Sequence, residues 1–287
     1  MQLIRAIKKL GLLILLCSVV FAVQAQTNPK QGSTWPNQAI RIIVPFTPGG
    51  APDILARVLA ESWQQSLSVP VLVENRPGAN GTIAADLLMK SAPDGYTLMV
   101  GSIGTFAINP ALQPKLSYSP LRDFDLITVA VRNPNILIAT PRLGVSSLSE
   151  LIAYMKKNPG KTSMVSSGTG SSDHLSAELL WQRTGTTGIH VPYKGGSAAM
   201  TDLIGGQIDM IFMTSPEAAP HVQSGKVRSL AVSSVRRLKS LPRLPTMVEA
   251  GITGYEMTQW YGVVAPTGLP PAVLARLSSG LIEVIKS

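Results

Sequence analysis

From residue 36 onward, apolar residues alternate between strand-like runs and helix-like spacing. Residues 40–46 (IRIIVPF) form a β-branched run that predicts a buried strand, and residues 54–65 place apolar side chains on one helical face. The same patterns predict strands at 69–74 and 96–100 and a helix at 82–90. The order β-α-β-α-β predicts a parallel sheet with right-handed crossovers.

A second series of the same kind follows a long β-prone stretch at 124–139 (FDLITVAVRNPNILIA), which we expect to break at Asn133 and Pro134. The predicted helices lie at 148–157, 172–183 and 197–204, and the predicted strands at 162–166, 189–193, 208–213, 230–233 and 260–265. The last strand can return to the first sheet. The pattern therefore predicts an α/β protein with two lobes.

Each series contains a strand, a glycine-rich turn and a helix, written IRIIVPF-TPGGAPD-ILARVLAE and TSMVS-SGTGSSD-HLSAELLW. In open α/β sheets, ligands bind beyond the carboxyl ends of the strands. A helix N-terminus there offers unpaired N–H groups and a partial positive charge. The second turn adds the hydroxyls of Ser166, Ser167, Thr169, Ser171 and Ser172. The two turns predict a shared site for an anionic oxygen, held without a formal charge.

Other chemistries for the second turn fit its spacing less well. A phosphate loop needs Gly-Lys-Ser/Thr or a third glycine, whereas Asp173 stands at the third glycine position. A serine hydrolase needs a G-x-S-x-G elbow, which is absent, and His174 follows Ser171 too closely to act as its base. The histidines His174, His190 and His221 have no metal-ligand spacing. Capping of an ordinary helix by serine remains open for one turn taken alone.

The first residues predict export. Arg5, Lys8 and Lys9 precede an apolar stretch at 11–23, and Val23-Gln24-Ala25 supplies small residues for cleavage. The apolar stretch is shorter than the ~20 residues of a membrane span. We therefore expect a signal peptide at 1–25, a polar linker at 26–35 and a periplasmic protein.

Composition and charge narrow the function classes. Hydrophobic residues make up 45% of the chain and charged residues 14%, which excludes a disordered chain. The single cysteine, Cys17, lies in the predicted signal peptide, so we expect no disulfide and no thiol chemistry after cleavage. Removal of the predicted signal peptide would leave 22 basic and 16 acidic residues, a net charge of +6. Apart from Arg236, Arg237 and Lys239 this charge is spread along the chain, without the clusters of a nucleic-acid-binding surface.

The joint order of several motifs resembles the extracytoplasmic receptors of tripartite tricarboxylate transporters, also called Bug receptors. The segments that carry the resemblance are WPNQAIRIIVPFTPGGAPDILAR (35–57), VENRPGANGTIAAD (73–86), PDGYTLMVGS (93–102), VSSGTGSSDHLSAELL (165–180), HVPYKGGSAAMTDLIGGQIDMIF (190–212), SGKVRSLAVSSVRR (224–237) and LPTMVEAGITGYEMTQWYGVVAPTGLPPAVLARL (244–277). The resemblance implies a type II periplasmic binding protein whose two α/β lobes are joined by a two-strand hinge. It implies lobe 1 at 36–131 and 259–287 and lobe 2 at 132–258.

The resemblance also implies the ligand and the residues that bind it. The family binds small carboxylates through main-chain N–H groups, hydroxyls and waters, and delivers them to membrane permease subunits. The implied contacts are Phe46, Thr47, Pro48, Gly49 and Gly50 in the first turn, Ser166, Ser167, Gly168, Thr169, Gly170 and Ser171 in the second, and His174, Thr105, Tyr193, Thr214 and Ser215 around them. Asp53 and Asp209 are implied as structural residues near the site. No cofactor, metal or nucleic acid is expected, and the receptor is expected to be a monomer.

Two features depart from the family pattern. Where many relatives have an acidic or amide residue after the strand at 208–213, this chain has Met213, Thr214 and Ser215. We therefore expect no buried anion there, which disfavours ligands with an amino group and favours plain carboxylic or aromatic acids. Relatives also continue past the helix at 270–286. Either the sequence is truncated there or the protein lacks part of lobe 1, and only in the second case do we expect the apolar face of that helix to be partly uncovered. Two alternative functions stay open: a serine hydrolase that uses the 166–172 turn, and a ligand sensor for a two-component system.

Overall fold

The fold was analysed in a computed structural model that describes residues 35–286. The predicted signal peptide and the linker up to residue 34 lie outside the described residues. Gln38–Ser287 forms one compact unit. Among the described residues, no helix combines the length and the apolar character needed to cross a membrane.

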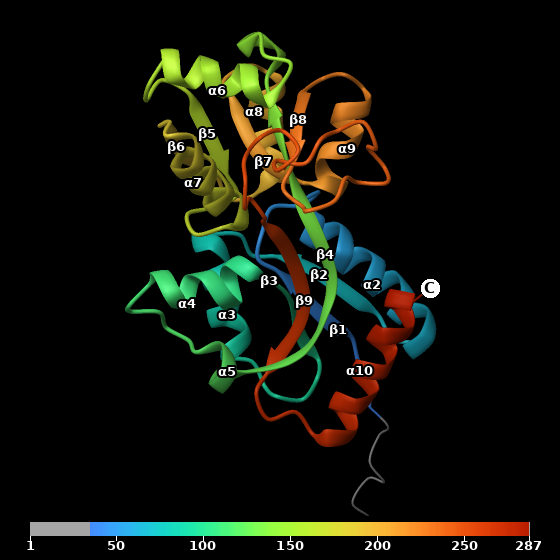
Figure 1. The fold of residues 1–287 in the computed structure, drawn as a ribbon. Helices are drawn as coiled ribbons and strands as arrows, with labels where there is room; N and C mark the ends of the chain where they lie inside the picture. The colour runs from blue at the N-terminus through green and yellow to red at the C-terminus, as the bar shows by residue number, and fades with distance from the viewer. Residues whose placement is uncertain (1–34, 287) are drawn as a thin grey trace, which may run out of the picture. The chain divides into compact units, whose positions relative to one another are not determined.

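Lobe 1 is built on a sheet with the strand order β2-β1-β3-β9-β4. Strand β1 runs parallel to β2 and β3, whereas β9 runs antiparallel to β3 and β4. Helices α2 and α10 pack side by side, and α3 and α4 lie on the other side of the sheet (Figure 1). The elements are β1 (Ile40–Val44), α2 (Ala51–Leu67), β2 (Val71–Asn75), η1 (Ala79–Gly81), α3 (Thr82–Met89), β3 (Thr97–Ser102), η2 (Gly104–Ile108), α4 (Asn109–Leu112), α5 (Pro120–Asp123), β9 (Thr258–Pro266) and α10 (Pro271–Lys286).

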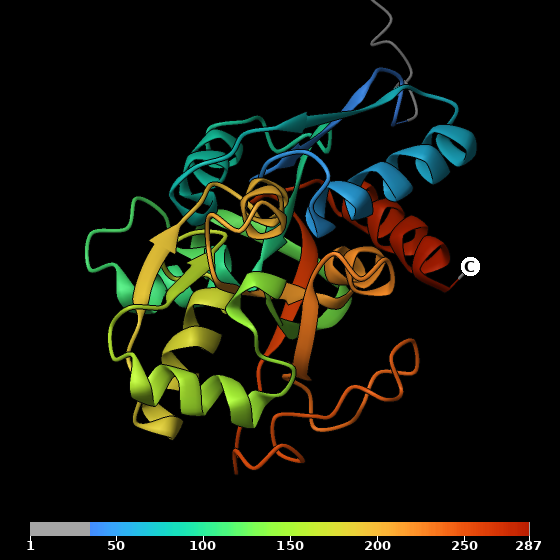
Figure 2. The same ribbon diagram turned by 90° about the horizontal axis from the view of Figure 1, so that it is seen from above.

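Lobe 2 contains the second sheet, in which β4 lies between β8 and β7, followed by β5 and β6. Strand β5 is parallel to β6 and β7, as the alternating sequence pattern predicts. Helices α6, α7, α8 and α9 surround this sheet (Figures 1 and 2). The elements are β4 (Phe124–Ala139), η3 (Pro141–Leu143), α6 (Leu148–Lys157), β5 (Ser163–Ser166), α7 (Ser172–Thr184), β6 (Ile189–Pro192), α8 (Gly196–Ile204), β7 (Met210–Thr214), α9 (Ser215–Gln223) and β8 (Arg228–Val232).

Strand β4 connects the two sheets without the break that the sequence predicts. Pro134 is the last β4 residue paired with β9, opposite Thr258, and Asn135 is the first paired with β7, opposite Thr214. Proline lacks a ladder N–H, but at the change of partners this does not interrupt the strand. The expected break is therefore a change of sheet. The residue limits that we assigned to the lobes remain a prediction.

Helix α9 is the main element that the pattern does not predict. Its sequence, SPEAAPHVQ, carries Pro216 in the first turn and Pro220 inside the helix. Proline suits the first turn but normally interrupts a helix interior, so the segment resembles a loop. Ser215, which the resemblance implies as a ligand contact, begins this helix.

Alternation along β4 divides the core of lobe 2 into two layers. Leu137 and Ala139 belong to one buried cluster, and Ile136 and Ile138 to the cluster on the opposite face of the sheet. Both faces of this strand are therefore covered.

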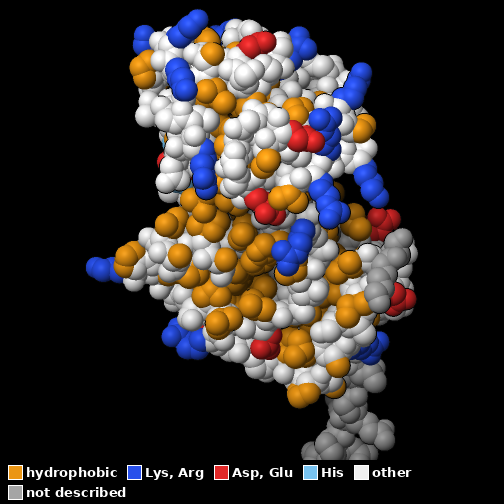
Figure 3. All heavy atoms as spheres, viewed as in Figure 1, with side chains coloured by type: hydrophobic (Ala, Val, Ile, Leu, Met, Phe, Trp, Pro, Cys, Tyr) orange, Lys and Arg blue, Asp and Glu red, His pale blue; other side chains and the backbone are white. Residues whose placement is uncertain are grey.

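Lobe 1 exposes more of its apolar side chains. Leu126 and Val129 on β4 are 50% and 42% exposed, and Ile282 and Ile285 on α10 are 46% and 42% exposed. Figure 3 shows apolar side chains gathered over the face of lobe 1 that carries β4 and β9. Part of the apolar surface of α10 is thus uncovered, while Leu277 and Leu281 on the same helix are buried.

Candidate functional site

The first loop (residues 46–50) joins β1 to α2 and is organised by Asp53. This carboxylate accepts hydrogen bonds from the Gly49 N–H (2.9 Å), from Asn75 Nδ2 (2.9 Å) and from the Arg57 guanidinium (2.9 and 3.1 Å). Burial alone would raise the pKa of Asp53, but the bonds from Arg57, Gly49 and Asn75 outweigh it and lower the pKa. Asp53 therefore stays ionised and fixes the loop.

The second loop (residues 166–171) joins β5 to α7 and has its own aspartate in the equivalent place. Asp173 accepts from the Ser167 N–H (2.5 Å) and from Ser167 Oγ (2.9 Å). Ser171 caps α7 by accepting from the His174 N–H (3.3 Å), and His174 Nδ1 accepts from the Gly170 N–H (3.1 Å). Burial raises the pKa of Asp173 in spite of its hydrogen bonds. Several loop N–H groups thus already have partners within the chain.

A serine–histidine pair lies beneath the second loop. It contains His190, whereas the sequence analysis considered His174 as a base for serine. Ser166 Oγ lies 2.6 Å from His190 Nε2 and accepts from the Gly168 N–H (3.2 Å). The His190 and His174 rings stack with their centroids 3.9 Å apart. Burial, and to a smaller extent repulsion from His174, lowers the pKa of His190 to about 4. A neutral His190 can accept a hydrogen bond from Ser166 Oγ, but Ser166 is fully buried and cannot meet a substrate. The pair supports the loop.

Two pockets adjoin these loops. The outer pocket has a volume of about 240 Å³, close to the lower end of the range typical of ligand pockets. Its walls come from both lobes: Pro45, Phe46, Gly78, Ala79, Asn80 and Gln113 from lobe 1, and Ser167, Gly168, Thr169, Pro192, Tyr193 and Lys194 from lobe 2. Its lining includes an exposed lysine, Lys194, which the sequence did not indicate as a site residue.

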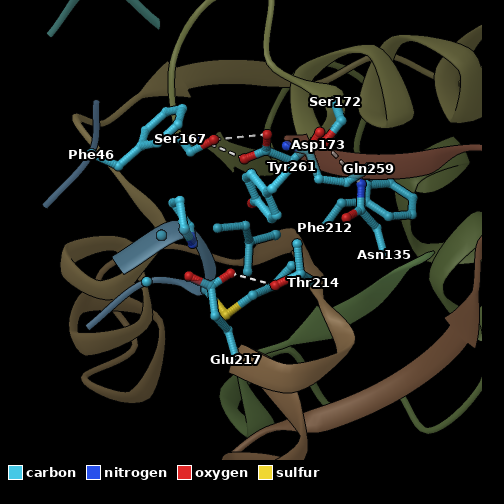
Figure 4. A pocket seen from close by; sticks show the side chains of 15 residues that line it. Phe46, Asn135, Ser167, Ser172, Asp173, Phe212, Thr214, Glu217, Gln259 and Tyr261 are labelled. Carbon is cyan, nitrogen blue, oxygen red and sulfur yellow. Dashed lines mark hydrogen bonds between the residues drawn. The ribbon is translucent and has the colours of Figure 1, made fainter. Parts of the chain in front are cut away.

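The inner pocket shares Phe46 and Ser167 with the outer one and has a volume of about 30 Å³. This is room for one or two water molecules. Figure 4 shows the side chains that converge on it. Its lining consists of Phe46, Gly50, Pro52, Asn135, Ser167, Ser172, Asp173, Gly196, Ile211, Phe212, Met213, Thr214, Glu217, Gln259 and Tyr261.

Glu217 makes the inner pocket acidic. From the first turn of α9 its carboxylate accepts from the Ala51 N–H of α2 (2.8 Å) and from Thr214 Oγ1 (2.6 Å). Burial raises the pKa of Glu217, and the charge of Asp173 raises it further. Burial and the same two carboxylates raise the pKa of Tyr261, which keeps its hydroxyl protonated. The sequence gives no sign of an acidic residue beyond β7, but α9 brings the carboxyl group of Glu217 to that place.

The first loop also contacts helix α8 of lobe 2. Thr47 Oγ1 lies 2.9 Å from Ser197 Oγ, which donates to the Pro48 carbonyl oxygen (3.0 Å). Gly195 must lack a side chain here, because a Cβ would lie 2.3 Å from Thr47 Oγ1. Together with the bond between Ala51 and Glu217, these contacts hold the two lobes against each other.

The residues predicted for the site divide between those that line a pocket and those that do not. Those that line a pocket are Phe46, Gly50, Ser167, Gly168, Thr169, Tyr193 and Thr214. Those that line neither pocket are Thr47, Pro48, Gly49, Thr105, Ser166, Gly170, Ser171, His174 and Ser215. Thr105, for example, is fully buried and donates to the Asn80 carbonyl oxygen (3.1 Å). Asp209 accepts from the N–H and the hydroxyl of Ser163, which ties β5 to the start of β7.

Among the lining residues that were not predicted from the sequence are Asn80, Asn135, Asp173 as a pocket group, Lys194, Glu217, Gln259 and Tyr261. Lys194 follows the predicted Tyr193 directly, and the position of Asp173 after the glycine loop matches that of Asp53. Asn135 and Gln259 give no such signal, because each lies within a strand. Within residues 35–286, no three His, Cys, Asp or Glu side chains gather in a way that could hold a metal ion.

Comparison with known proteins places these features in a family. The model of the tripartite tricarboxylate transporter family receptor matches residues 55–286. Protein BugT of Bordetella pertussis is 37% identical over 276 residues, which cover 96% of this chain and 85% of BugT.

Two solved structures have the same fold. The periplasmic binding protein BugD is 36% identical, covers 88% of this chain and 83% of BugD, and superposes with a TM-score of 0.82. MatC from Rhodopseudomonas palustris, with bound malate, is 32% identical, covers 88% of this chain and 86% of MatC, and has a TM-score of 0.84. The two-lobed α/β fold is that of the periplasmic binding proteins, and the chain belongs to the tripartite tricarboxylate transporter family of receptors.

Proposed function

We propose that the protein is a periplasmic receptor that captures one small carboxylate between its lobes and delivers it to the permease subunits of a tripartite tricarboxylate-type transporter. The observation that carries this proposal is the outer pocket, which takes its walls from both lobes. A ligand there touches both lobes at once, so its binding energy favours the closed arrangement. MatC, which shares the fold, holds a dicarboxylate, malate.

The outer pocket suits a carboxylate through a cation and hydroxyl donors. Lys194 brings a positive charge, Ser167 and Thr169 bring hydroxyl groups, and Asn80 brings an amide. Most N–H groups of the second loop already donate within the chain. We therefore assign the ligand carboxylate to Lys194 and the hydroxyls more than to the bare loop N–H groups.

Localisation and quaternary state are part of the same proposal. Residues 1–25 direct export and are removed after Ala25, and the receptor acts as a monomer in the periplasm. A permease recognises the closed lobes. A ligand sensor would use the same capture step and differ in its membrane partner, a sensor kinase.

We propose binding without turnover. The Ser166–His190 pair supports the second loop, and its burial separates it from the pocket. A serine-reactive probe should therefore leave the purified protein unlabelled, whereas labelling that Ser166→Ala removes would favour the hydrolase.

Titration calorimetry on protein freed of co-purified ligand by unfolding and refolding tests the capture step. Di- and monocarboxylates should bind with a stoichiometry of one and raise the melting temperature as their concentration exceeds the dissociation constant. Lys194→Gln should weaken this binding, while Lys226→Gln, which removes a cation outside the pocket lining, should not. If no organic acid bound, the proposed function would be refuted.

A further inference from the structure

The inner pocket contains a buried acceptor without a partner. Asn135 is 1% exposed, and its Nδ2 donates to Ser172 Oγ (3.4 Å) and Ser176 Oγ (3.3 Å). Its Oδ1 has no hydrogen-bond partner among the described residues, and Figure 4 shows the carbonyl end of the side chain facing the pocket. A buried acceptor left unpaired is costly, so this oxygen calls for a donor from within the pocket.

The neighbouring groups call for the same kind of partner. Asp173 and Glu217 both line the pocket, and their carboxylates can only accept hydrogen bonds when ionised. Burial raises the pKa of both carboxyl groups, and the charge of Asp173 raises the pKa of Glu217 further. A positive donor between them would relieve this repulsion, whereas a second carboxylate would increase it.

Size and charge indicate which part of a ligand enters. A cavity of about 30 Å³ accepts a group the size of a water molecule. An ammonium group has this size and offers three N–H donors, which matches the three acceptor groups of Asn135, Asp173 and Glu217. The outer pocket has the opposite polarity, since Lys194 lines it, and the two pockets meet at Phe46 and Ser167.

We propose that the inner pocket is an ammonium subsite, so that the ligand is an amino acid or another amino-substituted organic acid with its carboxylate in the outer pocket. This inference rests on the proposed receptor function and specifies its ligand class. It reverses the expectation from the sequence that a plain carboxylic acid is preferred. Glu217 connects the ammonium group to closure, because the same carboxylate accepts the Ala51 N–H from the other lobe.

Pairs of acids that differ only by an amino group test the subsite. Succinate and aspartate, glutarate and glutamate, and butyrate and γ-aminobutyrate are titrated into the ligand-free protein by calorimetry, with melting temperatures as a second readout. We expect at least one amino member to bind about tenfold or more tightly than its unsubstituted partner, because its ammonium group bonds to charged acceptors.

Glu217→Gln separates the subsite from general effects on closure. The amide keeps the shape and can still accept the Ala51 N–H, but it removes the charge. The amino acid should then bind about tenfold or more weakly, while the unsubstituted acid binds equally or more tightly. Asp173→Asn should likewise weaken the binding of the amino acid and leave the binding of the unsubstituted acid equal or tighter. Glu150→Gln, on helix α6 outside the pocket lining, serves as the matched control and should change neither.

The outcomes distinguish this inference from the receptor function. If unsubstituted acids bind and their amino partners bind no better, the protein remains a carboxylate receptor and the inner pocket holds only water. If Glu217→Gln weakens both members of a pair alike, Glu217 acts only in closure and the subsite is also refuted. If neither member of any pair binds, the proposed function itself fails. Urea unfolding of each variant confirms that a lost affinity does not reflect a lost fold.

Discussion

The neutral histidine beneath the second loop predicts a specific loss of stability in acid. His190 has a pKa of about 4 in the folded protein, compared with 6.5 for the free side chain. Between these values the unfolded chain binds a proton that the folded chain does not, so stability falls as the pH drops from about 7 toward about 4. The facing groups are His174, which repels a proton on His190, and Ser166, which needs His190 as an acceptor.

The size of the effect follows from the shift. Each pKa unit corresponds to about 1.4 kcal/mol, so lowering the pH from about 7 to about 5 should remove up to about 2 kcal/mol through this residue. Because His190 is partly accessible to water, screening reduces the expected loss to about 1–2 kcal/mol. The raised pKa values of Asp173 and Glu217 act in the opposite sense, since their protons stabilise the fold in acid.

The assay must therefore isolate His190 from these carboxyl groups. Urea unfolding of the wild type and of His190→Gln is measured at several pH values, and the difference between their free energies of unfolding is plotted against pH. The wild type should lose its advantage by about 1–2 kcal/mol between pH 7 and about 5. His221→Gln, on helix α9, is the matched control, because it replaces a histidine outside the second loop. A flat difference for His190→Gln would refute the neutral histidine.

Three further predictions concern the loops. Gly168→Val should abolish ligand binding and cost about 1–3 kcal/mol in urea unfolding, because Gly168 has φ +149, where a side chain is strained. Ser197→Ala removes both bonds to the first loop and should weaken ligand binding in calorimetry by about threefold to tenfold, with little change in urea unfolding, since its contacts join the lobes. Asp53→Asn should lower the free energy of unfolding by about 1–3 kcal/mol at neutral pH. This penalty should shrink in acid, where the wild-type carboxylate with its lowered pKa also becomes protonated.

The arrangement of elements could be predicted because local pattern and tertiary structure agree. Helix α6 has the predicted bounds 148–157, since a serine cap and a single apolar face define it. The strand that begins at Ile40 was predicted from its β-branched run, and the glycine loops from their position after strands. The sequence is sufficient to predict an element when its local pattern alone determines where that element begins and ends.

The acidic pocket could not be predicted, because its lining residues lie far apart in the sequence and come together only in the folded structure. Glu217 lies in α9, which the sequence pattern does not predict because the segment contains two prolines. Its carboxylate accepts the Ala51 N–H of α2 in the other lobe. Asn135 lies in a strand, and the neighbouring sequence does not show whether its side-chain amide is hydrogen-bonded. Its Nδ2 bonds to Ser172 and Ser176 on α7, which leaves Oδ1 without a partner among the described residues. Such sites depend on how two lobes pack, and a one-dimensional pattern carries no record of that.

The two loops use the same device with opposite electrostatic results, and this difference gives the cleft its polarity. In each lobe an aspartate in the first turn of a helix accepts an N–H of the preceding loop, Asp53 from Gly49 and Asp173 from Ser167. Arg57 neutralises Asp53 and lowers its pKa, so the first loop adds no net charge. Asp173 is buried with a raised pKa, and it lines the pocket together with Glu217. A receptor with two neutral loops would select only for a carboxylate. With one compensated and one uncompensated aspartate, the same loops select for a ligand that brings its own positive charge to the inner pocket.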